Sequence, residues 1–206
     1  MDDETMRAWA YLSRVAEPPC RRLAGLVSQV GAVEAAERIA RAAVDADLAA
    51  DTAARREIDT AAADLDRLER RGGRLIRPED DEWPELGFTA FGSSVWRDKS
   101  RSGPPIVLWA IGPARLADGA ERAAAVVGTR ASTAYGDHIA ADFAAGLAEH
   151  DVAVVSGGAY GIDGAAHRSA LAADGVTVAA LAGGIDILSP AGLAALLHRF
   201  GATGLL

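Results

Sequence analysis

The chain has 206 residues, half of them apolar, and a formal net charge of −8. A negative balance disfavours a protein that holds nucleic acid through bulk positive charge, so any anion site must be local. The single cysteine excludes an internal disulfide. The sequence contains no uninterrupted apolar stretch of roughly 18 residues, so we predict no membrane span. Because the acidic N-terminus is also unlike a signal peptide, we expect a cytoplasmic protein.

Residues 1–73 predict a small helical domain. Apolar residues at helical spacing predict a first helix that ends at Pro18-Pro19, because proline cannot continue a helix. A second helix follows, and a third is predicted over Val33 to Ala43. Asp45 to Arg71 is rich in alanine, aspartate and arginine and predicts one longer helix.

Residues 74–118 predict a connecting region. It contains a short strand at Arg74 to Ile76, an acidic turn bounded by prolines, and a strand over Ile106 to Ile111.

Residues 119–206 predict alternating strands and helices. The strands are continuous apolar runs, as expected when helices cover both faces of a parallel sheet. We therefore expect an α/β protein in which the helical domain precedes a Rossmann-like, doubly wound parallel sheet. Since open sheets usually have about 5–6 strands, we expect a fragment whose sheet is incomplete at the C-terminus. The predicted strands are Ala123–Val127, Val152–Val155 and Val176–Leu181, and the predicted helices are Gly136–Glu149, Ile162–Ala173 and Ala191–Phe200.

Two glycine-rich turns follow the first two of these strands. Each leads into a helix, where glycines allow close approach of an anion and free N–H groups offer hydrogen bonds. Two such turns at neighbouring strand ends suit a nucleotide or a chain of phosphates. Arg130 is predicted to contact phosphate, and the alternative is a surface arginine paired with Asp137 or Asp163. The predicted phosphate contacts are Gly128, Thr129, Arg130, Ser156, Gly157, Gly158 and Gly161.

Further polar and glycine residues at this edge are accessory candidates, namely Tyr160, Asp163, Gly183, Gly184 and Asp186. Asp163 and His167 lie four residues apart on one predicted helix, so they fit an acid/base pair or two metal ligands. No third ligand is evident, and we favour a structural role in which Asp163 caps the helix and His167 bonds to the neighbouring layer. The turns match neither a Walker A loop nor a nucleophile elbow. We expect no catalytic residue, metal or cofactor.

Three ordered motifs carry a resemblance to a known family. They are Val127 to Arg130 with Tyr135-Gly136, Ser156 to Leu171, and Gly183-Gly184 with Asp186 and Pro190. With them the chain resembles the DNA-processing protein A (DprA or Smf) family of natural transformation. The resemblance implies a sterile-alpha-motif-like helical domain followed by an extended Rossmann-like domain. It also implies binding and protection of incoming single-stranded DNA, loading of the recombinase RecA, a homodimer, and no catalysis.

The chain departs from that family pattern in three places. Tyr160 stands where many members carry arginine, so an aromatic ring replaces a charge and would stack on a base. Ser189 replaces the tyrosine before Pro190, and the later strands and dimer surface have no counterpart before Leu206. Two alternatives stay open, a Rossmann-like nucleotide-binding hydrolase and a truncated fragment without function.

Overall fold

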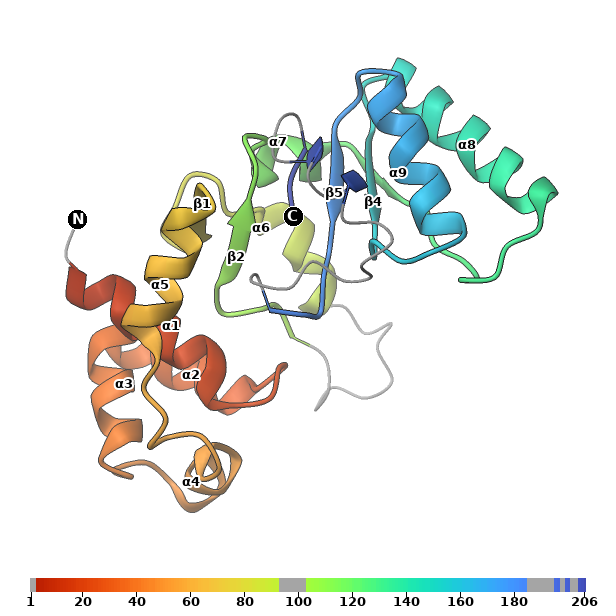
Figure 1. Ribbon diagram of the computed structural model, residues 1–206. Coiled ribbons are helices and arrows are strands. Elements are labelled where there is room, and N and C mark those ends of the chain that lie inside the picture. Colours follow the sequence, from red (N-terminus) through yellow and green to blue (C-terminus); the bar gives the residue numbers. More distant parts are fainter. Residues whose placement is uncertain (1–2, 93–102, 185–194, 197–198, 201–203) are drawn as a thin grey trace. The chain divides into compact units, whose positions relative to one another are not determined.

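A computed structural model describes residues 3–92, 103–184, 195–196, 199–200 and 204–206 (Figure 1). The chain divides into two compact units. The first contains residues 1–70, 75–80 and 88–108, and the second contains 71–74, 81–87 and 109–206. The predicted connecting region, 74–118, thus contributes residues to both. Among the described residues, none of the helices is both long and apolar enough to cross a membrane.

The first unit is built on five helices. They are α1 (Asp3–Val15), α2 (Arg21–Val30), α3 (Ala32–Ala40), α4 (Ala46–Thr52) and α5 (Ala61–Arg70). Helix α1 contacts α3 and α5, and its Trp9 and Leu12 are buried together with Ile39 and Leu48 from other helices. Burial of these apolar side chains is the main stabilising contribution to this unit.

The single long helix predicted over Asp45 to Arg71 is wrong, because two helices are separated by a turn. The Asp45 side chain accepts a hydrogen bond from the Leu48 amide and starts α4. Asp59 accepts one from the Ala61 amide at the start of α5. Short polar side chains that bond to nearby backbone favour helix starts over helix interiors. The Tyr11 hydroxyl also donates to the Arg56 carbonyl at 2.7 Å, which holds the turn against α1.

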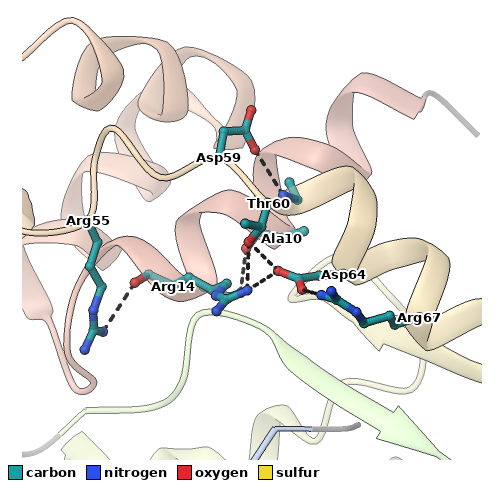
Figure 2. Close-up of polar contacts among 9 residues, drawn as sticks. Ala10, Arg14, Arg55, Asp59, Thr60, Asp64 and Arg67 are labelled. Carbon is teal, nitrogen blue, oxygen red and sulfur yellow. Dashed lines mark hydrogen bonds and ion pairs between the residues drawn. The ribbon is translucent and has the colours of Figure 1, made fainter.

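A polar network joins α1 to α5 (Figure 2). Arg14 on α1 donates to the Thr60 hydroxyl at 2.7 Å and pairs with Asp64. Asp64 also accepts from Thr60 and from Arg67 one turn further along α5. Burial raises the pKa of Asp64, but the bonds from Thr60 and Arg14 outweigh it, so the pKa is lowered overall. The Asp64 carboxylate is the acceptor that ties the two helices together.

The chain between the helices and the parallel sheet forms short elements. Strands β1 (Gly73–Ile76) and β2 (Leu108–Ile111) form a two-stranded sheet, and α6 (Glu85–Phe88), a 3-10 helix (Thr89–Gly92) and α7 (Leu116–Glu121) complete this part. Within the second unit Arg74 pairs with the buried Glu82 and donates to the Gly112 and Ala114 carbonyls. Glu82 also accepts from the Leu116 amide at 2.8 Å. This ion pair holds the segment after β2 and the start of α7.

The second unit contains the predicted parallel sheet. Strands β3 (Ala123–Ala125), β4 (Ala153–Ser156) and β5 (Thr177–Ala179) pair in that order, with Val154 opposite Ala124 and Thr177. Helices α8 (Ala134–Glu149) and α9 (Ile162–Ala172) run side by side (Figure 1). Strands β3 and β5 are two and three residues shorter than predicted, because their apolar runs continue into the turns, and β4 has the predicted length but is shifted by one residue.

Helices cover both faces of this sheet, as the apolar strands predict. Ala144 of α8 and Ala166 and Ala170 of α9 pack with Val154 of β4 in one buried cluster. Helix α7 lies on the other face, where a Cβ built on Gly119 would lie 3.6 Å from the Val178 side chain. Parallel strands interleaved with covering helices confirm the predicted α/β architecture.

The last described residues extend the sheet beyond β5. Leu205 accepts from the Ala179 amide and donates to the Thr177 carbonyl, forming a parallel bridge to Val178. Leu206 exchanges two backbone hydrogen bonds with Ile111 of β2. The predicted helix Ala191–Phe200 lies largely outside the described residues, as do Ser189 and Pro190. Phe200 is described, and it is fully buried against the Leu171 and Ala179 cluster.

Candidate functional site at the carboxyl edge of the parallel sheet

The predicted glycine turns lie at one edge of the sheet. Because β3, β4 and β5 are parallel, the turns that follow them begin at the same, carboxyl, edge. The first runs from Val126 to Thr133, the second from Gly157 to Gly161, and the third begins at Ala180. The sheet thus brings two of the predicted phosphate-binding segments, one from each of the first two turns, to neighbouring positions.

The first two turns are in direct backbone contact at Gly161. This residue has a φ of +75°, and a Cβ atom built on it would lie 2.2 Å from the Thr129 carbonyl oxygen and 2.8 Å from that of Arg130. A side chain therefore cannot occupy this position without moving the first turn. The Ile162 amide, which begins α9, donates to the Thr129 carbonyl at 3.3 Å. Gly161 is therefore required because the protein's own backbone approaches it closely, and not because a bound phosphate does.

Ile162 is the side chain around which three segments meet. A Cβ built on Gly128 would lie 2.6 Å from Ile162 Cγ1, and one built on Gly136 would lie 3.3 Å from Ile162 Cδ1. Gly128 belongs to the first turn and Gly136 to the first turn of α8. The missing side chains at these two glycines make room for Ile162. The first glycine turn and the starts of α8 and α9 consequently form one continuous surface.

The second turn is braced by Asp163. Its Oδ2 atom accepts from the Gly157 amide at 3.2 Å and the Ala159 amide at 3.4 Å. The predicted helix cap is therefore wrong, because the N-cap position of α9 is Gly161 and Asp163 lies inside the first turn. The carboxylate points back at the loop because two loop amides converge on it. These two donors of the predicted phosphate cradle are already occupied by a buried carboxylate.

Ser156 is also used within the protein. Its hydroxyl donates to the Val126 carbonyl at 2.6 Å, and its side chain is buried. This bond ties the end of β4 to the residue after β3. The remaining predicted contacts differ in exposure, with Gly158 buried, Gly161 partly buried, and Gly128, Thr129 and Gly157 exposed.

Arg130 is the exposed cation of this edge. In the described part of the chain its guanidinium forms no ion pair or hydrogen bond. The alternative partners are engaged elsewhere, because Asp137 accepts from Ser132 and Asp163 from the loop amides. The Thr129 hydroxyl accepts from the Ala131 amide at 3.2 Å. Among the side chains of the first turn, the Arg130 guanidinium thus remains available to bind an anion.

The accessory candidates are only partly described. Gly183 and Gly184 are exposed in the third turn, whereas Asp186 lies outside the described residues. Tyr160 lies in the second turn with 46% of its surface exposed. Tyr135, in the first turn of α8, is 74% exposed at the same edge and was not among the predicted site residues. The sequence feature that could have identified Tyr135 as a site residue is its position at a helix start shortly after a glycine turn.

His167 has the structural role predicted for it. Its Nδ1 atom lies 2.7 Å from the Thr177 hydroxyl oxygen, and that hydroxyl donates to the Val154 carbonyl at 2.9 Å. Because a hydroxyl has one proton, His167 Nδ1 must be the donor of its bond. The ring is fully buried and stacks edge-on against Phe200 at 5.0 Å. Burial lowers the pKa of His167 to about 4, against the opposing effect of Asp163.

A shallow groove is lined by residues of both α8 and α9. It is lined by Asp137, His138, Ala141, Ala165, Arg168 and Ser169, and none of the predicted site residues lines it. Within the described ranges, no three His, Cys, Asp or Glu side chains are grouped so that they could hold a metal ion. The chemistry available at the sheet edge is thus hydrogen bonding, one guanidinium and two exposed phenol rings.

Comparison with known proteins decides the family. The family model described as DNA recombination-mediator protein A matches residues 74–206, which is more than half of the chain. The chain belongs to the DNA recombination-mediator protein A family. The predicted resemblance to DprA and Smf proteins is confirmed.

Named relatives agree with this family assignment. A DNA processing protein DprA of Mycobacterium tuberculosis is 66% identical over 206 residues, all of this chain and 53% of that protein. Protein Smf of Synechocystis is 30% identical over 144 residues, covering 69% of this chain and 33% of its own length. The chain thus spans about half or less of the length of these recombination-mediator relatives.

Solved DprA structures share the fold. The crystal structure of DNA processing protein A from Streptococcus pneumoniae matches 99% of this chain and 66% of its own, with a TM-score of 0.67 at 23% identity. DNA processing protein A from Helicobacter pylori, studied for its single-stranded DNA binding mode, matches 65% of this chain and 53% of its own, with a TM-score of 0.50 at 24% identity. At these identities the likeness concerns the fold.

Proposed function

We propose that this chain binds single-stranded DNA at the carboxyl edge of β3 and β4. The observation that carries the proposal is the exposed Arg130 guanidinium, which has no ionic partner in the described residues, on a turn packed against a second glycine turn. An arginine beside exposed backbone is suited to a phosphate. The single-stranded DNA binding of the Helicobacter pylori family member supports the same ligand here.

The proposed contact is local. With a net charge of −8, long-range attraction of DNA is weak, so affinity must come from a few short hydrogen bonds. Because two loop amides bond to Asp163, we assign the phosphate contact to Arg130 together with the exposed backbone at Gly128 and Thr129. Few phosphate contacts also imply a shallow dependence of affinity on salt.

We further propose a binding role without catalysis. The histidine closest in sequence to the second turn, His167, is buried against Thr177 and has a pKa near 4, so it is neutral and enclosed at pH 7. A general acid or base must reach the substrate. Protection of incoming DNA during transformation, loading of RecA and homodimer formation are part of the proposal and rest on the family resemblance. A cytoplasmic location is also part of it and rests on the composition.

The test is fluorescence anisotropy of a labelled oligothymidine, single-stranded against duplex, at two salt concentrations. We expect preference for the single strand and about a ten-fold loss of affinity for Arg130→Ala, because a charge-assisted hydrogen bond contributes roughly 1.5–3 kcal/mol. Arg122→Ala is the matched control, since Arg122 is an exposed arginine at the opposite end of β3. Equal affinities of the two variants would remove Arg130 from the site.

A further inference from the structure

Two exposed aromatic rings flank Arg130 at the sheet edge. Tyr135 follows it by five residues in the first turn of α8, and Tyr160 lies in the second glycine turn. Their exposed fractions are 74% and 46%. Val127, next to the first glycine, is 70% exposed as well. Burying a large apolar side chain away from water is favourable. Several exposed apolar or aromatic side chains beside a cation therefore indicate a ligand surface.

The backbone contacts bring the segments that carry these rings together. Tyr135 is followed by Gly136, and Tyr160 comes two residues before Ile162. Ile162 lies against both Gly128 and Gly136, and Gly161 lies against the carbonyls of Thr129 and Arg130. The segments that carry Tyr135, Arg130 and Tyr160 therefore meet around one side chain. We call Val127, Arg130, Tyr135 and Tyr160 the edge patch.

The chemistry of the edge patch matches a nucleic acid strand whose bases are free. A guanidinium holds a phosphate, and an aromatic ring stacks on any base because every base has a flat π face. In a duplex those faces are covered by neighbouring base pairs. Exposed rings beside a phosphate contact therefore favour single strands over duplexes without selecting a sequence.

We propose that Tyr135 stacks on a nucleobase of a bound single strand, with Tyr160 as the second stacking ring of the edge patch. The inference rests on the proposed function and adds the source of its preference for single strands. Arg130 contacts the backbone and contributes to binding of any strand. Tyr135 contacts the base and contributes only where a base is present.

Helix α8 offers a matched control for Tyr135. Phe143 is a second aromatic residue on this helix and is 66% exposed. It lies eight residues further along, which is about 12 Å at 1.5 Å per residue. Truncating Phe143 removes a similar exposed ring away from the glycine turns. A general effect of lost surface apolarity would appear in both variants.

The experiment compares two labelled oligomers with equal numbers of phosphates, oligothymidine and an abasic strand. For the 206-residue chain we expect oligothymidine to bind about ten-fold tighter than the abasic strand, the order of one stacked base. Tyr135→Leu should abolish most of this difference while leaving the affinity for the abasic strand unchanged. Tyr135→Phe should keep the difference, and so should Phe143→Leu. Thermal melts monitored by circular dichroism should be the same for all variants, because both rings are exposed.

The outcomes separate this inference from the proposed function. Equal binding of the two oligomers by the unaltered chain, or a difference that Tyr135→Leu leaves undiminished, would overturn the stacking role. In either case an effect of Arg130→Ala on both oligomers would still support the DNA site. If the unaltered chain binds neither oligomer, the stacking role and the DNA site both fall.

Discussion

Replacing Gly161 by alanine places a methyl group where the backbone of the neighbouring turn already lies. The new Cβ would lie 2.2 Å from the Thr129 carbonyl oxygen, so one of the two turns must move. The φ of +75° and ψ of −129° cost a residue with a side chain about 1–3 kcal/mol. Loss of the Ile162 amide bond to Thr129 adds about 1 kcal/mol. Alanine also reduces the conformational entropy of the unfolded chain, which offsets about 0.4–1 kcal/mol of this loss of stability.

The expected net effect of Gly161→Ala is a loss of about 1–3.5 kcal/mol in the free energy of unfolding of the second unit. Gly146→Ala is the control, because Gly146 lies inside α8 with no atom within 4 Å of an added Cβ. There alanine should stabilise by about 0.5–1 kcal/mol.

Urea denaturation followed by circular dichroism measures the two stability changes. Hydrogen exchange of peptides from β3 and β4 assigns them to the sheet. Gly161→Ala should also lower single-strand affinity, since the first turn carries Arg130. If the two alanine variants shift the urea midpoint in the same direction by similar amounts, the packing argument for Gly161 is refuted.

Two further predictions concern pH. The folded pKa of His167, about 4, lies below the ordinary 6.5, so the unfolded chain binds more protons between these values and stability falls as pH drops through that window. The loss should reach about 3 kcal/mol near pH 4, and His167→Gln should flatten it in urea titrations at several pH values. Because the folded pKa of Asp64 is lowered, the carboxylate contributes stability to the first unit that is fully present above the ordinary pKa of 3.8. This stability is lost as pH falls from 3.8 through the lower, folded pKa. Asp64→Asn should therefore cost about 1–2 kcal/mol at pH 7 and little near pH 2, and an unchanged urea midpoint at pH 7 would contradict the network in Figure 2.

Local patterns predicted most elements of the second unit. Helix α9 begins at Ile162, as its glycine-to-apolar switch predicts, and β4 ends at Ser156, one residue beyond its predicted end. The break between α4 and α5 was missed, and one helix was predicted over Asp45 to Arg71, because the composition of this segment favours a helix throughout. At this break Asp59 accepts from the Ala61 amide and Tyr11 donates to the Arg56 carbonyl, and the second bond joins residues 45 positions apart, which local composition does not predict.

The roles of individual site residues were less accessible to prediction. A glycine is compatible with an approaching phosphate and with an approaching carbonyl, and sequence cannot distinguish them. At Gly161 the structure shows the Thr129 carbonyl. Likewise Asp163 at a helix start predicts a cap, but the distances assign it to the Gly157 and Ala159 amides.

The sequence by itself determined the family, the α/β class, and the edge of the sheet at which the glycine turns gather. These follow from local periodicity and from ordered motifs, which do not depend on distant contacts. Only the tertiary structure decided which donors of that edge remain available. Whether the Gly157 amide, the Ser156 hydroxyl or the Arg130 guanidinium is engaged depends on partners brought together by strand pairing and helix packing. Hydrogen-bond satisfaction is a property of the folded neighbourhood, so it cannot be read from residue order alone.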